Sequence, residues 1–240
     1  MFKLKLLLVA VSLLFLQREW SDTFDSGKLD NAAWRPTSQS DFNVKVIDVF
    51  DKGKDGVPDF RLRLRADTMG TDDATVKYLG VRSVRKFTLR PGTRISAQLD
   101  WNEQVNGSYL SSALILSPEL TSRNPLENQN YLKVEYFGVP PGINARMAVG
   151  MKSQGRENPM LFTEGWPETN RSGRRIQKVD VAIVVKAAGF EVLENDRVLF
   201  DSQKLRVPFA TTYLYLQMST HSNYRVRELF WDNIKALNAH

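Results

Sequence analysis

The chain has 240 residues, of which 42% are hydrophobic, a formal net charge of +6 and no cysteine. This length suits one well-buried domain, since all-β domains commonly fill it without splitting. The lack of cysteine excludes a disulfide framework and the acylated cysteine of a lipoprotein anchor. The positive charge favours polyanionic partners, but the basic residues form no recognisable nucleic-acid-binding module, so nucleic acid is not an expected partner.

The chain begins with a charged start and a short apolar run. Two lysines lie within residues 1–5, and residues 6–16 form the run. This pattern is typical of a signal peptide, and the run is shorter than the ~20 residues that a membrane-spanning helix requires. We expect residues 1–17 to be a signal peptide or N-terminal apolar segment and residues 18–240 to form a single domain. The protein is then expected to be secreted, periplasmic or on the cell surface, without a stable membrane span.

Alternation of apolar and polar residues with a period of two recurs along the rest of the chain. It is clearest at 59–66, where apolar residues alternate with Arg61, Arg63 and Arg65. Such alternation predicts β-strands. The predicted strands are 42–50, 59–66, 77–84, 93–101, 110–117, 131–138, 144–151, 176–186, 189–194, 197–201, 212–220 and 229–237. We expect residues 152–175 to be a surface loop with a binding role.

A dozen short strands without a helical period favour an all-β fold. Two antiparallel sheets packed face to face, a jelly roll or β-sandwich, would bury the apolar face of each strand. No repeat of fixed period is present, which argues against a propeller or solenoid.

The strand 131–138 carries candidate functional residues on one face. Tyr131, Lys133 and Glu135 project to one side, and the apolar residues between them project to the other. A second face of this kind is expected on 212–220, where Tyr213 and Tyr215 share a side with Gln217 and Ser219.

Aromatic and basic side chains extend this candidate surface. Sugars stack their apolar ring faces on aromatic side chains, and Trp101 and Trp166 are candidates to enlarge such a platform. The alternative is that half of these aromatics belong to the core. The stripe that includes Arg63 is a candidate contact for sulfate or uronate groups, or else a solvated strand face.

The residues 131–138 read YLKVEYFG, which resembles the strand E-[IL]-D-[IV]-E-[FW]-x-G of the laminarinases and lichenases of glycoside hydrolase family sixteen. Weaker likenesses at 22–34, 80–97, 179–198 and 230–234 follow the family's order and cover most of residues 20–238. The resemblance implies a concanavalin A-like β-sandwich.

The resemblance also assigns roles. In the family the first Glu of the strand is the nucleophile and the last Glu is the acid/base, so Tyr131 replaces the nucleophile, Lys133 replaces the supporting Asp, and only Glu135 remains as a catalytic candidate. Retaining hydrolysis needs two carboxylates about 5–5.5 Å apart. Family members often hold a structural calcium with the Asp of the terminal strand, which corresponds to Asp232. No other cofactor is implied.

The sequence is therefore compatible with two classes of function, a polysaccharide-binding protein and a polysaccharide-cleaving enzyme. We expect an exported protein that binds a polysaccharide, preferentially an acidic one, without retaining hydrolysis, through Tyr131, Lys133, Glu135, Trp101, Trp166, Tyr213, Tyr215 and Arg63. The alternative is an enzyme that cleaves polysaccharide, either a hydrolase that uses Glu135 or an alginate-type lyase. Segments 82–85 and 131–133 faintly resemble motifs of such lyases, and His221 is the candidate base.

Overall fold

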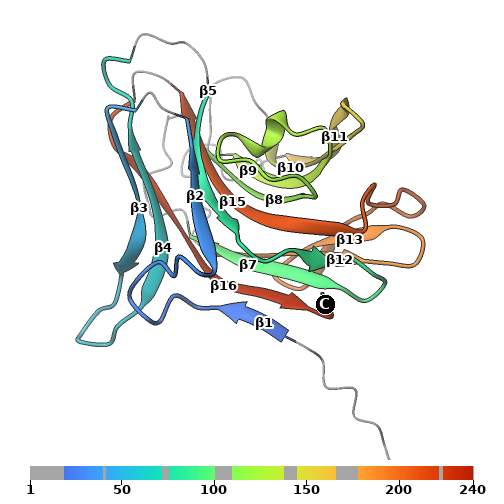
Figure 1. The fold of residues 1–240 in the computed structure, drawn as a ribbon, viewed down its shortest axis with the longest axis horizontal. Coiled ribbons are helices and arrows are strands. Elements are labelled where there is room, and N and C mark those ends of the chain that lie inside the picture. The colour runs from blue at the N-terminus through green and yellow to red at the C-terminus, as the bar shows by residue number, and fades with distance from the viewer. Residues whose placement is uncertain are drawn as a thin grey trace, which may run out of the picture.

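The computed structural model describes residues 19–39, 42–71, 76–100, 110–137, 145–165, 178–221 and 224–239. The predicted all-β fold is confirmed: two eight-stranded antiparallel sheets lie one over the other (Figure 1). One short 3-10 helix, η1 (Pro125–Glu127), is present among these residues. No helix in the described ranges is long and apolar enough to cross a membrane.

The first sheet is built mainly from the chain's middle and C-terminal strands. β1 lies beside β16 outside the main path. In spatial order its strands are β14 (Arg197–Asp201), β13 (Phe190–Glu194), β12 (Lys178–Val185), β7 (Arg94–Asp100), β16 (Arg227–Leu237), β4 (Phe60–Asp67) and β3 (Val44–Asp51), with β1 (Glu19–Asp22) at its side.

The second sheet contains the candidate strand and its neighbours. β6 pairs with β15 off the main path. In spatial order its strands are β11 (Arg156–Gly165), β10 (Ala145–Ser153), β9 (Tyr131–Phe137), β8 (Leu110–Ser117), β15 (Thr211–His221), β5 (Val76–Ser83) and β2 (Trp34–Ser38), with β6 (Phe87–Thr88) beside β15.

Most predicted strands are present, and β8 and β14 have the predicted bounds. The prediction of one loop over 152–175 is wrong in its first part, because β10 and β11 form a hairpin there. β11 is an edge strand, and its residues 156–158 are exposed. An edge strand exposed to water on one side carries a weak apolar alternation.

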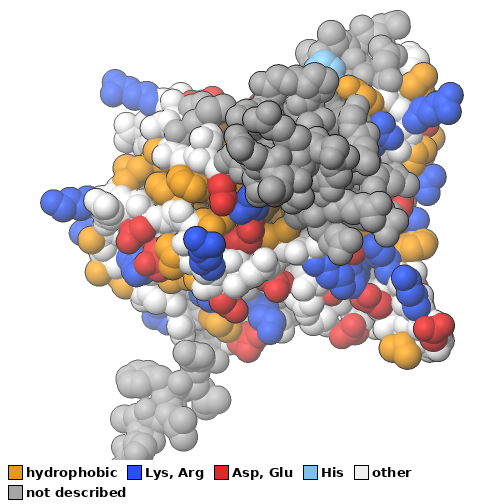
Figure 2. Space-filling model, turned by 180° about the vertical axis from the view of Figure 1, so that it is seen from behind, with side chains coloured by type: hydrophobic (Ala, Val, Ile, Leu, Met, Phe, Trp, Pro, Cys, Tyr) orange, Lys and Arg blue, Asp and Glu red, His pale blue; other side chains and the backbone are white. Residues whose placement is uncertain are grey.

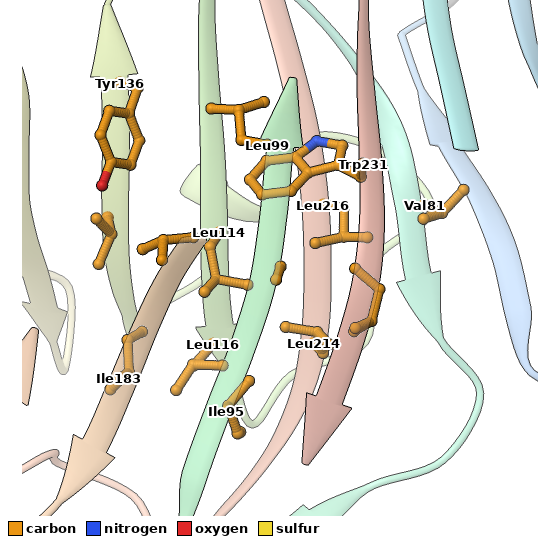
Figure 3. Close-up of a cluster of buried hydrophobic side chains, with 14 of the residues drawn as sticks. Val81, Ile95, Leu99, Leu114, Leu116, Tyr136, Ile183, Leu214, Leu216 and Trp231 are labelled. Atoms are coloured by element: carbon orange, nitrogen blue, oxygen red, sulfur yellow. The ribbon is translucent and has the colours of Figure 1, made fainter. Parts of the chain in front are cut away.

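The core lies between the two sheets and follows from the alternation. Leu99 and Trp231 of the first sheet face Leu114 and Leu216 of the second, and all four are 0% exposed (Figure 3). Full burial of one such aliphatic side chain contributes roughly 2 kcal/mol. Residues on the other side of each strand form the outer face of each sheet, by which we mean the face that points away from this core.

An ion triad links the two sheets near the β10–β11 hairpin. Arg146 of β10 donates to Glu194 of β13 through two nitrogens at 2.7 and 3.0 Å, and it also bonds Glu164 of β11. The side chains of Arg146 and Glu194 are each 14% exposed. Because the charges are mostly removed from water, the guanidinium is required to compensate the two carboxylates.

Replacing Arg146→Met should therefore lower the free energy of unfolding by about 3 kcal/mol, since two partly buried carboxylates lose their counter-charge. The matched control is Arg94→Met, because Arg94 pairs with Asp196, whose side chain is 82% exposed. An exposed pair contributes about 0–1 kcal/mol. Urea denaturation of the three proteins measures both values, and equal losses in the two variants would contradict a structural role for the triad.

Candidate functional site

The outer face of the second sheet carries the residues singled out on the candidate strand. β9 sends Leu132 and Val134 into the core and sends Tyr131, Lys133 and Glu135 to the outer face. This face continues onto β8 and β15 on one side and onto β10 on the other, because these strands pair in sequence with β9.

Glu135 is the centre of a buried polar group, here called the Glu135 cluster: Ser111, Lys133, Glu135 and Ser219. The Ser111 hydroxyl donates to Glu135 Oε1 at 2.7 Å, and Lys133 Nζ donates to Oε2 at 2.8 Å. Ser111 also shares a hydrogen bond with Ser219 of β15. Lys133 and Glu135 are only 8% and 7% exposed. The charge of Lys133 is therefore neutralised by its own strand neighbour, and both carboxylate oxygens are occupied by protein donors.

The β8–β9 loop (residues 118–130) folds over one end of this face. Leu126 packs on Ala113, Ile115, Tyr131 and Tyr215, which form a small apolar cluster outside the main core. The loop thus covers the Tyr131 end of the candidate site.

Polar side chains fix this loop in place. The Glu119 carboxylate accepts from the backbone nitrogens of Gln129 and Asn130, both at 2.9 Å. Asn124 caps η1 by accepting from Leu126 N at 3.0 Å, and it also accepts from Gln217 Nε2 at 3.1 Å. Because its ends and its turn are all bonded, the loop is held against the sheet as part of the folded domain.

Tyr131 is therefore a covered phenol. Its side chain is 0% exposed, and its hydroxyl donates to Glu157 of β11. Burial and the neighbouring Glu157 carboxylate raise the pKa of Tyr131 far above its usual value of 10. The phenol accordingly stays protonated at any ordinary working pH, which removes its capacity to act as an anionic nucleophile.

The expected aromatic platform is only partly present. Tyr215 is 0% exposed, and its hydroxyl donates to the Glu119 carbonyl at 2.6 Å, so its ring offers no free face for stacking. Tyr213 is half-buried, and Lys86 Nζ lies 5.3 Å from its ring centroid. Trp101 and Trp166 lie outside the described residues. The sequence could not show the covering of Tyr215, because Leu126 reaches it from a loop 89 positions away, the difference between 215 and 126.

Arg63 does not belong to this face, which corrects its prediction as part of the same binding surface. It lies on β4 in the first sheet and points to that sheet's outer face. Its guanidinium donates to both oxygens of Asp48, at 2.9 and 2.6 Å, and lies 4.3 Å from the Phe50 ring centroid. The alternation predicts on which side of its strand Arg63 lies, but only the tertiary structure shows that this strand, β4, belongs to the first sheet.

Asp232 lies on the outer face of the first sheet, at a bulge in β16 where Asn233 has a φ of 50°. Its carboxylate accepts from Asn233 N at 2.7 Å and from Asn233 Nδ2 at 3.1 Å. Within the described ranges, no group of three or more His, Cys, Asp or Glu residues could hold a metal ion. A calcium ion also takes backbone carbonyl and water oxygens as ligands, so the calcium that the resemblance implies at Asp232 stays a prediction.

A carboxylate from another strand lies at the Tyr131 end of this face. The carboxylate beside Tyr131 is that of Glu157, which lies across β10 and is bonded to the phenol. The Glu157 carboxylate is therefore occupied by the Tyr131 hydroxyl, and the Glu135 carboxylate is occupied by Lys133 and Ser111.

No family model and no curated protein matches the chain in sequence. Solved structures do match in fold. The catalytic domain of an endo-1,3-β-glucanase (laminarinase) from Thermotoga petrophila aligns with a TM-score of 0.58 and 14% identity, over 93% of this chain and 99% of that chain. A prokaryotic β-1,3-1,4-glucanase (lichenase) from a mouse hindgut metagenome aligns with a TM-score of 0.57 and 12% identity, over 92% and 99%.

A lectin-type structure is similar as well. The carbohydrate recognition domain of Emp46p aligns with a TM-score of 0.55 and 8% identity, over 87% of this chain and 89% of that chain. At such identities the fold is the shared property. The chain therefore has the concanavalin A-like β-sandwich that the sequence motifs predicted, and this architecture is common to glucan-cleaving enzymes and to a carbohydrate recognition domain.

The burial of Asp232 predicts that the free energy of unfolding depends on pH. Burial raises the pKa of Asp232 from 3.8 to about 6, although the Asn233 backbone and Arg61 act in the opposite direction. The folded state thus keeps a proton that the unfolded state has released, so this group's contribution to stability is lost as pH rises from about 4 to about 6. Asp232→Asn should abolish that loss and raise the free energy of unfolding at pH 7.5 by on the order of 1 kcal/mol, with a smaller gain near pH 4.

Urea denaturation at the two pH values, with calcium and with a chelator, measures this effect. The control is Asp196→Asn, since that carboxylate is exposed. A wild-type protein that gains stability with calcium in an Asp232-dependent manner would contradict the expected sign and would support the calcium site.

Proposed function

We propose that this protein is an exported polysaccharide-binding β-sandwich that lacks the retaining hydrolysis of the laminarinases with which it shares a fold. The observation that carries the proposal is that the functional groups of Tyr131 and Glu135 are already bonded to other protein groups. Tyr131 occupies the nucleophile position as a covered, protonated phenol, and Glu135 is bonded to Lys133 and Ser111. A fold used by glycan-binding and glycan-cleaving proteins is retained, while the pair of free carboxylates is not formed.

The state of Glu135 argues against proton transfer as well. A general acid must reach the leaving oxygen within hydrogen-bond distance and release a proton to it. Both oxygens of Glu135 already accept from protein donors, and the residue is 7% exposed. Proton delivery would first require the loss of one of these bonds.

We further propose that the preferred ligand is acidic. Lys133 and Arg63, the basic residues first expected to bind it, do not support this preference. Lys133 is neutralised by Glu135, and Arg63 lies on the other sheet. The visible described surface carries positive and negative side chains intermixed rather than a field of one sign (Figure 2). The support is the net charge of +6 together with Arg82 and Lys86, which lie on the second sheet's side near Tyr213.

One experiment separates the candidate functions. The purified protein is tested for binding to a panel of neutral, uronate-containing and sulfated polysaccharides, and each mixture is assayed for new reducing ends and for absorbance from unsaturated ends. Binding without either product supports the proposal. New reducing ends indicate a hydrolase, unsaturated ends indicate a lyase, and no binding to any member of the panel would overturn the proposed function.

Rebuilding the hydrolase motif tests the site more sharply. The double variant Tyr131→Glu with Lys133→Asp places the family's three acids on β9, yet we expect no hydrolysis of laminarin or lichenan. The introduced carboxylate at position 131 would lie beneath Leu126 and beside Glu157, so two carboxylates would share a covered site, and the free energy of unfolding should fall by about 2–4 kcal/mol. Reducing-sugar assays measure hydrolysis, and thermal unfolding measures the loss of stability. The control is Leu132→Ile, a conservative core change on the same strand. Efficient hydrolysis by wild type or variant would refute the assignment.

Export is proposed from residues 1–17 and is tested separately. We expect the native protein to be recovered outside the cytoplasm with a mature start between residues 17 and 24. Intact-mass measurement of protein from its native source gives the start directly. A cytoplasmic protein that begins at Met1 would exclude the proposed signal peptide.

A further inference from the structure

Two arginines stand directly opposite each other on the outer face of the second sheet. Arg35 of β2 and Arg82 of β5 are Cα partners in the antiparallel register. Their strand neighbours Trp34 and Val81 are 0% exposed and belong to the core, so both arginines point to the outer face. Like charges directly opposite on neighbouring strands destabilise a sheet.

Several other strand arginines among the described residues have carboxylate partners. Arg61 and Arg63 of β4 and Arg146 of β10 each pair with at least one carboxylate. Within the described part of the chain, neither Arg35 nor Arg82 forms an ion pair. Arg35 donates to the Asn31 carbonyl, and Arg82 donates to its neighbouring Ser83 carbonyl at a long 3.3 Å.

Arg82 also has an unsatisfied donor. Its Nε is buried and has no hydrogen-bond partner, although the side chain as a whole is half-buried rather than covered. A buried N–H group without a partner destabilises the folded state. Arg82 therefore has no carboxylate partner and one unpaired N–H group, and it faces the second cation Arg35. A site of this kind would be stabilised by an anion.

The neighbouring residue on β15 gives this site a sugar-binding context. Tyr215 is the partner of Arg82 across β5 and β15, and Tyr213 lies two residues before Tyr215 on the same face of β15. A diagonal neighbour of this kind lies about 7–8 Å away, which is within reach of a long side chain. Tyr213 is half-buried, in contrast to Tyr215, and it has Lys86 over its ring.

We propose that Arg35 and Arg82 form the subsite for the acidic group of the polysaccharide, a carboxylate or a sulfate ester, while the sugar that bears it contacts Tyr213. The inference rests on the proposed function and specifies its ligand. An oxyanion accepts parallel hydrogen bonds from a guanidinium and compensates both cations at once. The subsite lies on the β2–β5 side of the face, next to Tyr215, whose ring the β8–β9 loop covers.

Binding measurements on single variants test the subsite. The probes are an oligouronate, a sulfated oligosaccharide and a neutral glucan oligosaccharide, titrated against wild type, Arg82→Gln, Arg35→Gln and the control Arg197→Gln. Arg197 is an exposed arginine of β14 in the other sheet. Its replacement by Gln removes one positive charge from the protein, as the two test variants do. Arg82→Gln should weaken binding of an acidic probe by about tenfold or more and Arg35→Gln by about threefold, whereas Arg197→Gln should change it by less than about twofold.

Three further readouts separate the outcomes. Arg82→Lys should restore the charge but only part of the affinity, because a lysine cannot donate in a bidentate manner. Arg35→Gln should keep or raise the melting temperature at low salt, since the like-charge contact is relieved. The acidic probe that responds to Arg82 identifies the group as carboxylate or sulfate.

If wild type binds glycans and the affinities of the Arg35 and Arg82 variants match that of Arg197→Gln, the subsite is wrong while polysaccharide binding stands. If wild type binds none of the three probes and no member of the wider panel, the proposed function itself fails, and the subsite fails with it.

Discussion

The pairing of β8, β9 and β15 in one register is the constraint on which both the core and the candidate site depend. Alternate residues of each strand fill the space between the sheets, and the residues between them form the outer face. Glu135 lies opposite Ala113, which in turn lies opposite Gln217. A slip of one residue would move Lys133 and Glu135 into the core, so burial of the apolar face fixes the register of the functional face.

The β8–β9 loop converts one end of that face into protein interior. A loop that covers a sheet must satisfy its own backbone groups, and Glu119 and Asn124 supply the acceptors for this. Leu126 then completes an apolar cluster with Tyr131 and Tyr215. The same contacts that stabilise the loop therefore keep the Tyr131 phenol protonated and withdraw the Tyr215 ring from any ligand.

Several basic side chains among the described residues are compensated by carboxylates. Lys133 and Arg63, which looked like free cations in the sequence, each have a carboxylate partner. A buried charge is stable only with such compensation. Arg35 and Arg82 face each other without it, within the part of the chain that the structure describes, which is why the anion subsite is proposed on the β2–β5 side of the face.

The sequence by itself determined the fold class, most strands and the two faces of β9, because a period of two and the order of motifs are local properties of the chain. It could not assign β4 to the other sheet, place Leu126 over Tyr215, or bring Glu157 to Tyr131 and Arg35 to Arg82. Those contacts join residues far apart in sequence, and no local pattern encodes them. Only the tertiary structure decided which charges are paired and which aromatic rings are covered, since both depend on the neighbours that strand order and loop packing supply.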